Sequence, residues 1–290
     1  MEHSNFDTKY ADLVKEKNFY RLLLSVKSEL RKLVKKNIKE FFTLLIWALN
    51  ILKDNSEGES CLSLFQYAID EYEKVFNKLD LELCLEFIIK AFNSLPEELD
   101  KSKLKHRLLR FFEQKGFSEI SLLSHGVYKI FARDSLKNKD TLEGYRYALK
   151  SSDLASILEY VEYFTKNGLQ QNSERDFFIA RVCLELIHMK NLDLASKFIY
   201  NYVDTSNNLQ NMQNNHPIIN FAFLLTALLC KDASNFDNFW NFINIYKPII
   251  TIDFSFTKYL NKISSLYFNR TIIQEESGLN IMNLLRAFSG

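Results

Sequence analysis

The chain has 290 residues, of which 47% are hydrophobic and 25% charged, a composition that excludes an intrinsically disordered protein. The net charge of +1 excludes a strong global attraction to nucleic acid or to an anionic membrane surface. The chain contains only 7 Gly and 3 Pro, which argues against β-rich and α/β folds, because their frequent turns need these residues.

Apolar residues recur at three- and four-residue spacing along nearly the whole chain, the pattern of helices with one buried face. The first helix is expected around Leu13 to Val26, and the second between Phe41 and Leu52, before the polar run at 54–58. Pro96 is expected just inside the start of a later helix. Further helices are predicted at 60–77, 81–93, 98–114, 119–133, 141–149, 152–167, 174–189, 191–204, 217–231, 235–246, 255–268 and 278–288.

Helices of this length joined by short polar turns are typical of helical hairpins stacked in a row. We therefore predict an all-α fold, an α-solenoid of degenerate tetratricopeptide-like hairpins forming one continuous curved domain. The full tetratricopeptide consensus is absent, and the only tryptophans are Trp47 and Trp240. One connection differs from the others, because residues 204–216 are long and rich in Asn and Gln. This segment is either a surface loop or a binding element.

No motif for catalysis or for a cofactor is found. The glycines are scattered, which excludes a phosphate-cradling loop, and no two histidines have the spacing of metal ligands. The four cysteines, lacking any Cys-x-x-Cys pair, are expected as buried thiols: Cys61, Cys84, Cys183 and Cys230. We predict a protein that is not an enzyme and has no metal or cofactor, with an enzyme lacking a known motif as the least favoured alternative. The N-terminus has no secretion signal and no apolar stretch reaches about 20 residues, so we expect a soluble cytosolic protein.

Two surfaces are suited to binding partners. The segment from Lys27 to Lys39 is strongly basic, and Lys27, Arg31 and Lys35 are spaced to share one helix face. Such a face is either simply solvated or an electrostatic docking surface for an acidic partner, with RNA as a weaker alternative. Aromatic residues are dense from Phe221 to Tyr246, where core packing is favoured over a hydrophobic groove. The last expected helix, at 278–288, either caps the solenoid or presents its apolar stripe to a partner.

The second half of the chain, about residues 145–290, carries a pattern of spaced residues that resembles one known family. Residues 216–225 (HPIINFAFLL) are similar to a Pro-x-x-Asn-Phe-x-x-x-Leu helix, and residues 176–182 with Lys190-Asn191 to a Phe-x-Ala-x-x-Val helix followed by a Lys-Asn turn. The pattern continues at Tyr246-x-Pro248 and in the segments 253–268 and 278–285. Together these residues resemble the golgi-to-ER traffic protein four family of the guided-entry pathway for tail-anchored proteins.

The first half is less similar to that family. Residues 15–20 (KEKNFY) resemble its Lys-x-Gly-Asp-Tyr-Tyr segment, and Trp47-Ala48-Leu49 its Gly-Ala-Leu. The family's following Glu-Ala-His is replaced by Arg21-Leu22-Leu23, where its members contact a targeting ATPase.

The resemblance implies a helical adaptor in the cytosolic targeting of tail-anchored proteins to the endoplasmic reticulum. Residues 1–150 would bind a homodimeric targeting ATPase, and residues 151–290 would bind a ubiquitin-like-domain protein. For the ATPase side we predict the contact residues Tyr20, Lys27, Arg31, Lys32 and Lys35. For the ubiquitin-like side we predict Asn208, Met212, His216, Pro217, Asn220, Phe221, Phe223 and Leu225. The main alternative is a helical-repeat scaffold subunit of another cytosolic complex; a peptide-sensing regulator is less favoured, because no DNA-reading helix pair is evident.

Overall fold

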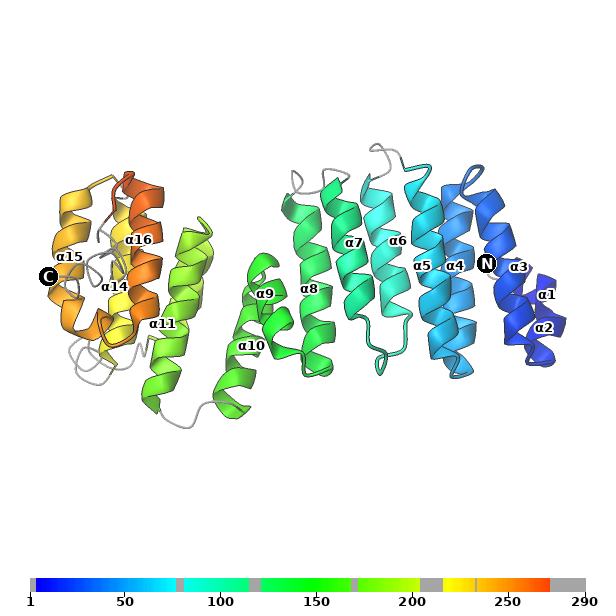
Figure 1. The fold of residues 1–290 in the computed structure, drawn as a ribbon, viewed down its shortest axis with the longest axis horizontal. Helices are drawn as coiled ribbons and strands as arrows, with labels where there is room; N and C mark the ends of the chain where they lie inside the picture. The colour runs from blue at the N-terminus through cyan, green and yellow to red at the C-terminus, as the bar shows by residue number, and fades with distance from the viewer. Residues whose placement is uncertain are drawn as a thin grey trace, which may run out of the picture. The chain divides into compact units, whose positions relative to one another are not determined.

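The structure is a computed structural model of the chain, and it describes residues 4–76, 81–114, 121–167, 172–203, 216–232 and 234–271. Every element of regular structure in these ranges is an α-helix, as the apolar spacing predicts. The chain forms two compact units, Met1–Ser156 (unit 1) and Ile157–Gly290 (unit 2), and each is described by itself. Within a unit, successive helices pack against one another in the manner of an α-solenoid (Figure 1).

Unit 1 is a row of helices in which each packs against a helix one or two places along the chain. From α3 onwards, α3 contacts α4 and α5, α4 contacts α5 and α6, α5 contacts α7, α6 contacts α8, and α8 contacts α9 (Figure 1). This pattern arises from hairpins stacked side by side. The helices of unit 1 are α1 (Ser4–Lys9), α2 (Ala11–Lys15), α3 (Phe19–Leu33), α4 (Ile38–Asp54), α5 (Gly58–Glu73), α6 (Leu81–Asn93), α7 (Ser102–Gln114), α8 (Ser121–Lys137) and α9 (Thr141–Lys150).

An aromatic cluster fills the core of unit 1. Phe41 and Phe42 of α4, Tyr72 of α5 and Phe111 of α7 are almost completely buried. The rings of Phe42 and Tyr72 meet edge to face at 5.1 Å, and those of Tyr72 and Phe111 lie 6.2 Å apart. Burying one such side chain contributes about 1.5–3 kcal/mol, so these rings account for much of the cohesion between α4, α5 and α7.

In unit 2 the last described helix returns to the first long one. The tip of α16 reaches α11, where the Tyr267 hydroxyl donates a hydrogen bond to the carbonyl of Ile187 at 3.2 Å. At the start of α16, the ring of Phe256 packs edge to face against that of Phe177 of α11 at 5.6 Å. Unit 2 contains most of α10 (Leu154–Asn167), then α11 (Asn172–His188), α12 (Leu192–Tyr200), α14 (Pro217–Lys231), α15 (Phe236–Ile250) and α16 (Phe254–Phe268).

Several turns are made without glycine. Lys17 and Lys190 have positive φ values of 52° and 62°, a conformation that side chains other than glycine adopt at some cost. In both turns the next residue is an asparagine, Asn18 or Asn191, whose side chain caps the following helix by accepting a backbone N–H hydrogen bond. The Lys-Asn turn noted in the sequence is therefore a helix stop followed by a helix start.

Some expected boundaries and environments were wrong, for local reasons. Helix α7 begins at Ser102 rather than at 98, because Asp100 accepts hydrogen bonds from the backbone N–H and hydroxyl of Ser102, and this leaves Pro96 in the preceding turn. Helix α15 runs past 246 and through Pro248 to Ile250, since a proline in the last turn removes only one hydrogen bond. Cys230 is exposed, whereas the other three cysteines are buried. The helix expected at 278–288 and residues 204–215 lie outside the described residues.

Candidate partner-docking surfaces

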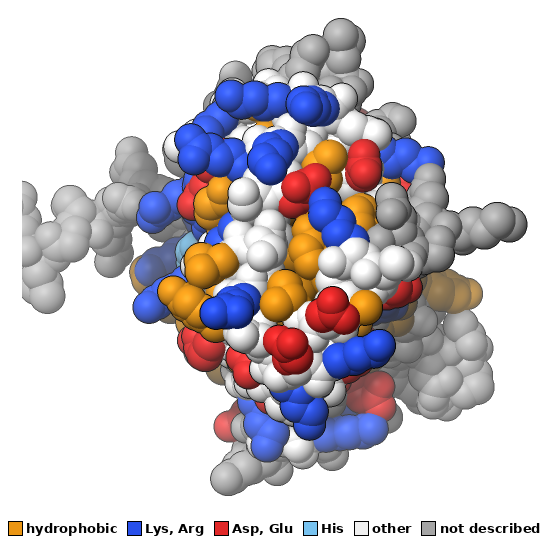
Figure 2. Space-filling model, turned by 90° about the vertical axis from the view of Figure 1, so that its right-hand side faces the viewer, with side chains coloured by type: hydrophobic (Ala, Val, Ile, Leu, Met, Phe, Trp, Pro, Cys, Tyr) orange, Lys and Arg blue, Asp and Glu red, His pale blue; other side chains and the backbone are white. Residues whose placement is uncertain are grey.

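Helix α3 separates its buried face from an exposed one. Leu22, Val26 and Leu30 are completely buried, whereas Tyr20 and Leu24, one turn apart, are 73% and 50% exposed. Figure 2 looks onto the end of unit 1 that carries α1 to α3, and it shows exposed apolar side chains among side chains of both charges, Lys and Arg as well as Asp and Glu. Exposed aromatic and aliphatic side chains within a charged rim are typical of a protein-binding surface.

The structure divides the predicted basic residues into two groups. Lys27 is half-buried and directed inward: its ammonium donates a hydrogen bond to the Ser63 hydroxyl at 2.9 Å and lies 5.4 Å from the centre of the Tyr67 ring. It therefore ties α3 to α5. Lys32 is exposed and pairs with Glu29 at 3.8 Å, a surface ion pair that contributes about 1 kcal/mol or less.

Arg31 and Lys35 are exposed and form no ion pair within the described part of the chain. The expectation that Lys27, Arg31 and Lys35 share one helix face was wrong for Lys35. Helix α3 ends at Leu33, and Lys35 lies in the turn before Asn37, whose side chain caps α4. Of the predicted residues, Tyr20, Arg31 and Lys35 are thus exposed and form no described ion pair, and Lys32 is exposed with a weak pair.

On the second predicted surface, only part of the residue set is accessible. His216 is exposed, and its Nδ1 lies 2.6 Å from Oδ2 of Asp176 on α11. Pro217 occupies the first turn of α14, and Phe223 is partly exposed. Asn208 and Met212 lie outside the described residues.

Three of the residues predicted to contact the ubiquitin-like partner are core side chains. Phe221 and Leu225 are completely buried, and Asn220 is 3% exposed. The Asn220 amide donates a hydrogen bond to the Tyr246 hydroxyl at 2.8 Å, and the Phe221 ring stacks on that of Phe242 at 5.5 Å. We correct the expectation for these three residues: in this structure they hold α14 against α15 and do not reach the surface.

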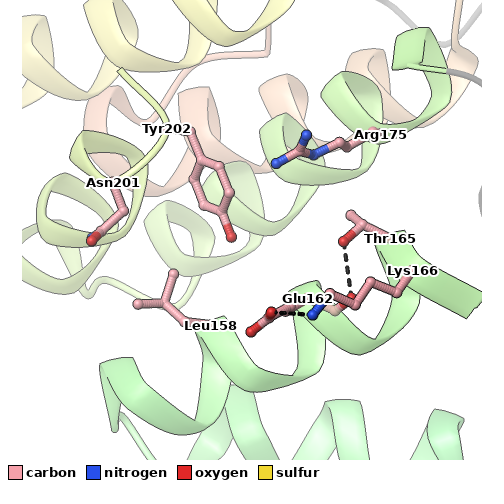
Figure 3. Close-up of a pocket in the computed structure, with 7 residues that line it drawn as sticks. All are labelled: Leu158, Glu162, Thr165, Lys166, Arg175, Asn201 and Tyr202. Carbon is pink, nitrogen blue, oxygen red and sulfur yellow. Dashed lines mark hydrogen bonds and ion pairs between the residues drawn. The ribbon is translucent and has the colours of Figure 1, made fainter. Parts of the chain in front are cut away.

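Unit 2 also has a pocket that sequence reasoning did not find. It has a volume of about 490 Å³ and is lined by side chains of α10, of the first turn of α11 and of the turn after α12 (Figure 3). On one wall Lys166 pairs with Glu162 at 2.6 Å, while the guanidinium of Arg175 lies on the opposite side. Leu158, Asn201 and Tyr202 complete the lining (Figure 3).

The pocket, which we call the α10–α12 pocket, presents polar and charged groups to a ligand. Arg175 forms no ion pair with a described carboxylate, so its guanidinium is available to an acceptor from outside. Burial raises the pKa of the Tyr202 hydroxyl to about 12, so this group stays protonated at neutral pH and can donate a hydrogen bond. Tyr202 also lies two residues before the segment 204–216, the long connection predicted as a surface loop or a binding element. The only sequence signal was the Glu162–Lys166 spacing, which is common on ordinary surface helices.

The described residues contain no group of three or more His, Cys, Asp or Glu side chains that could hold a metal ion. Among the same residues, no helix combines the length and apolarity needed to cross a membrane.

Comparison with known proteins identifies the family. The chain is 25% identical over 281 residues to the Golgi to ER traffic protein 4 homolog of Oryzias latipes, covering 94% of this chain and 80% of the relative. It is 26% identical over 243 residues to the Homo sapiens homolog, covering 81% and 71% of the two chains. The crystal structure of C. therm. Get4 has the same fold, with a TM-score of 0.65 at 11% identity, over 93% of this chain and 89% of that one. The model of the family described as Golgi to ER traffic protein 4 matches residues 35–288, and the chain therefore belongs to this family.

Proposed function

We propose that this protein is a non-enzymatic adaptor in the cytosolic targeting of tail-anchored membrane proteins to the endoplasmic reticulum. Unit 1 binds a homodimeric targeting ATPase, and unit 2 binds a ubiquitin-like-domain protein. Membership of a Golgi-to-ER traffic family supports the general role, and the resemblance of residues 145–290 supports the choice of partners. The observation that carries the ATPase side is the exposed set Tyr20, Leu24, Arg31 and Lys35. It consists of an apolar centre beside two cations that form no ion pair with a described residue.

The first experiment tests the ATPase side with exposed residues only. Arg31→Glu combined with Lys35→Glu is expected to weaken binding to the ATPase by about tenfold or more at low salt, because two attractive charges become repulsive. The affinity is measured by biolayer interferometry at two salt concentrations, and the loss shrinks at the higher one. Lys27 is left unchanged, because its contacts with Ser63 and Tyr67 would mix a folding effect into the result.

The matched control is Arg110→Glu combined with Arg146→Glu, which changes the net charge by the same amount. Both arginines are exposed, on α7 and α9 of unit 1, and form no ion pair among described residues. If the control variant loses as much affinity, the effect arises from net charge alone. Unchanged affinity of the Arg31 and Lys35 double variant would refute the assignment.

The second experiment tests unit 2 at the α10–α12 pocket. Arg175→Gln is expected to weaken binding of the ubiquitin-like protein, whereas Lys247→Gln, an exposed cation on α15, leaves it unchanged. Deletion of residues 204–215 is expected to release this partner while ATPase binding persists. Continued co-purification of the ubiquitin-like protein with the deletion variant would contradict the proposal.

A further inference from the structure

A second pocket lies in unit 1, where α6 ends, the chain turns towards α7, and the last turns of α8 pass alongside. Its volume is about 220 Å³, below the roughly 300 Å³ of pockets for drug-sized ligands. Phe92, Leu95 and Ile130 form an apolar part of the wall, and Lys101 and Asp134 form a charged part. A space of this size and lining suits one side chain or one small anion.

The charged part of the wall is buried and carries an excess of positive charge. The Asp134 carboxylate accepts a hydrogen bond from the Lys101 ammonium at 2.6 Å and pairs with the Lys105 ammonium at 2.8 Å. Both lysine side chains are 3% exposed, and the Asp134 side chain is 10% exposed. Two buried ammonium groups therefore share one carboxylate.

Lys101 and Lys105 differ in how many hydrogen bonds their ammonium groups donate. Lys105 also donates to the Ser135 hydroxyl at 2.7 Å, so it has two partners. Lys101 donates only to Asp134 and otherwise lies 5.5 Å from the centre of the Phe92 ring. An ammonium group has three N–H donors, so two of those on Lys101 have no acceptor among the described residues, at a place where the side chain lines the pocket.

A purely structural role does not require this arrangement. One lysine would suffice to neutralise Asp134 and to tie α8 to the start of α7, and a second buried cation without its own counterion is unfavourable. An anion entering the pocket would balance the excess charge and accept the unused Lys101 hydrogen bonds.

The other charged groups that line the pocket favour the same ligand. Arg133 lines it from α8, is exposed, and forms no ion pair with a described residue. Glu97 and Lys137, both more than half exposed, pair with each other. Among the lining residues, three cationic side chains stand against two carboxylates: Lys101, Arg133 and Lys137 against Glu97 and Asp134. Lys105, which does not line the pocket, adds a fourth cation through its pair with Asp134.

We propose that this pocket binds a carboxylate, with the Lys101 ammonium at its buried wall and the Arg133 guanidinium at the surface. The apolar wall of Phe92, Leu95 and Ile130 accommodates a short aliphatic stem, so the ligand is a glutamate-like group, carried by a protein partner or by a free small acid. The site is separate from the α3 surface and from the α10–α12 pocket, and it does not depend on the adaptor assignment.

The test is a pair of probes that differ only in charge. N-acetylglutamate amide and its neutral counterpart N-acetylglutamine amide are titrated into the full-length protein labelled with ¹⁵N. Amide resonances of residues 93–101 and 130–137 are expected to shift with the glutamate probe and to saturate, and to stay in place with the glutamine probe. The Arg133→Gln variant is expected to bind the glutamate probe about tenfold more weakly, because it loses a charge-assisted hydrogen bond. The control variant Arg146→Gln binds it as the unmodified protein does.

The outcomes separate the two sources of the carboxylate. A five-residue alanine peptide with one central glutamate is titrated in the same way. If it binds at least tenfold more tightly than the capped amino acid, the site is assigned to a protein partner. Equal affinity of the peptide and of N-acetylglutamate amide assigns the site to a free acid. Lys101→Met is expected to abolish binding; since Arg133 is exposed, Arg133→Gln still tests the site if Lys101→Met does not fold. Equal shifts with the charged and neutral probes, or full affinity of Arg133→Gln, would overturn the proposal.

Discussion

The start of α16 offers a prediction whose magnitude can be worked from two contacts. Asp253 accepts a hydrogen bond from the backbone N–H of Ser255 at 2.8 Å, which caps the helix, and it also pairs with Arg181 on α11. Loss of a cap costs about 1 kcal/mol. The ion pair is partly solvent-exposed, at 40% for Arg181 and 25% for Asp253, so its loss costs only about 0.5–1 kcal/mol. Asp253→Ala is therefore expected to destabilise unit 2 by about 1.5–2 kcal/mol.

Asp253→Asn separates the two contributions. Asparagine is as good a cap as aspartate but carries no charge, so this variant loses only the ion pair, about 0.5–1 kcal/mol. The difference between the Ala and Asn variants, about 1 kcal/mol, is the contribution of the cap.

The ion pair also predicts a dependence on pH. Burial alone would raise the pKa of the Asp253 carboxyl, but hydrogen bonds from Ser255 and the pair with Arg181 outweigh it, and the pKa lies below its ordinary value. A carboxyl with a lowered folded pKa stabilises the protein above its unfolded pKa of about 3.9, and this contribution is lost as pH falls through the folded value. The stability difference between the unmodified protein and Asp253→Asn should therefore be constant from pH 7 to about 5 and shrink below about 4.

The two tryptophans allow each unit to be followed separately. In a Trp47→Phe background, Trp240 of α15 is the only tryptophan, and its fluorescence during urea unfolding reports on unit 2. Asp193→Ala is the control, because Asp193 pairs with Lys197 on the exposed surface of α12 and should contribute less than about 0.5 kcal/mol. The reasoning is refuted if Asp253→Ala costs no more than Asp193→Ala, or if the Ala and Asn variants are equally stable.

Two further predictions concern buried groups. Burial raises the pKa of the Cys183 thiol to about 12, and burial together with the nearby Glu57 raises that of the Cys61 thiol to about 11. Iodoacetamide at pH 8 should therefore modify the exposed Cys230 first. Comparable modification of Cys183, measured by mass spectrometry, would contradict this. Asp134→Leu leaves two buried ammonium groups without a counterion and should cost about 3–5 kcal/mol, whereas Lys101→Met leaves a balanced pair and should cost less than half of that. The free energy of unfolding of both variants is measured from Trp47 fluorescence during urea unfolding, in a Trp240→Phe background. Equal losses of stability in the two variants would argue against an excess of buried charge.

Local patterns predicted the helices well, because the apolar residues on the buried face of a helix recur at three- and four-residue spacing. The stripe from Phe41 to Leu52 became the core face of α4 for this reason. Contacts between distant residues could not be predicted in the same way. Lys27 and Ser63 are 36 residues apart, and Lys101 and Asp134 are 33 apart, so the sequence could not show which lysines bond internally. The basic segment was recognised, but its division into Lys27, which faces inward, and Arg31, which faces outward, required the packed structure.

The pattern that carried the family resemblance is itself explained by packing. Pro217 starts α14, the Asn220 amide bonds the Tyr246 hydroxyl, and Phe221 stacks against α15, so the spaced residues meet one another inside unit 2. Substitution of Asn220, Phe221 or Tyr246 disturbs a buried contact, which ties this pattern to the fold more strongly than to a partner. Arg31 and Lys35 are exposed and form no ion pair within the described ranges, so packing there does not require them. The pattern of buried positions therefore reflects the fold and the family, while the proposed contact with a targeting ATPase rests on surface residues outside that pattern. Binding measurements on Arg31 and Lys35 thus test the part of the function that family membership alone does not establish.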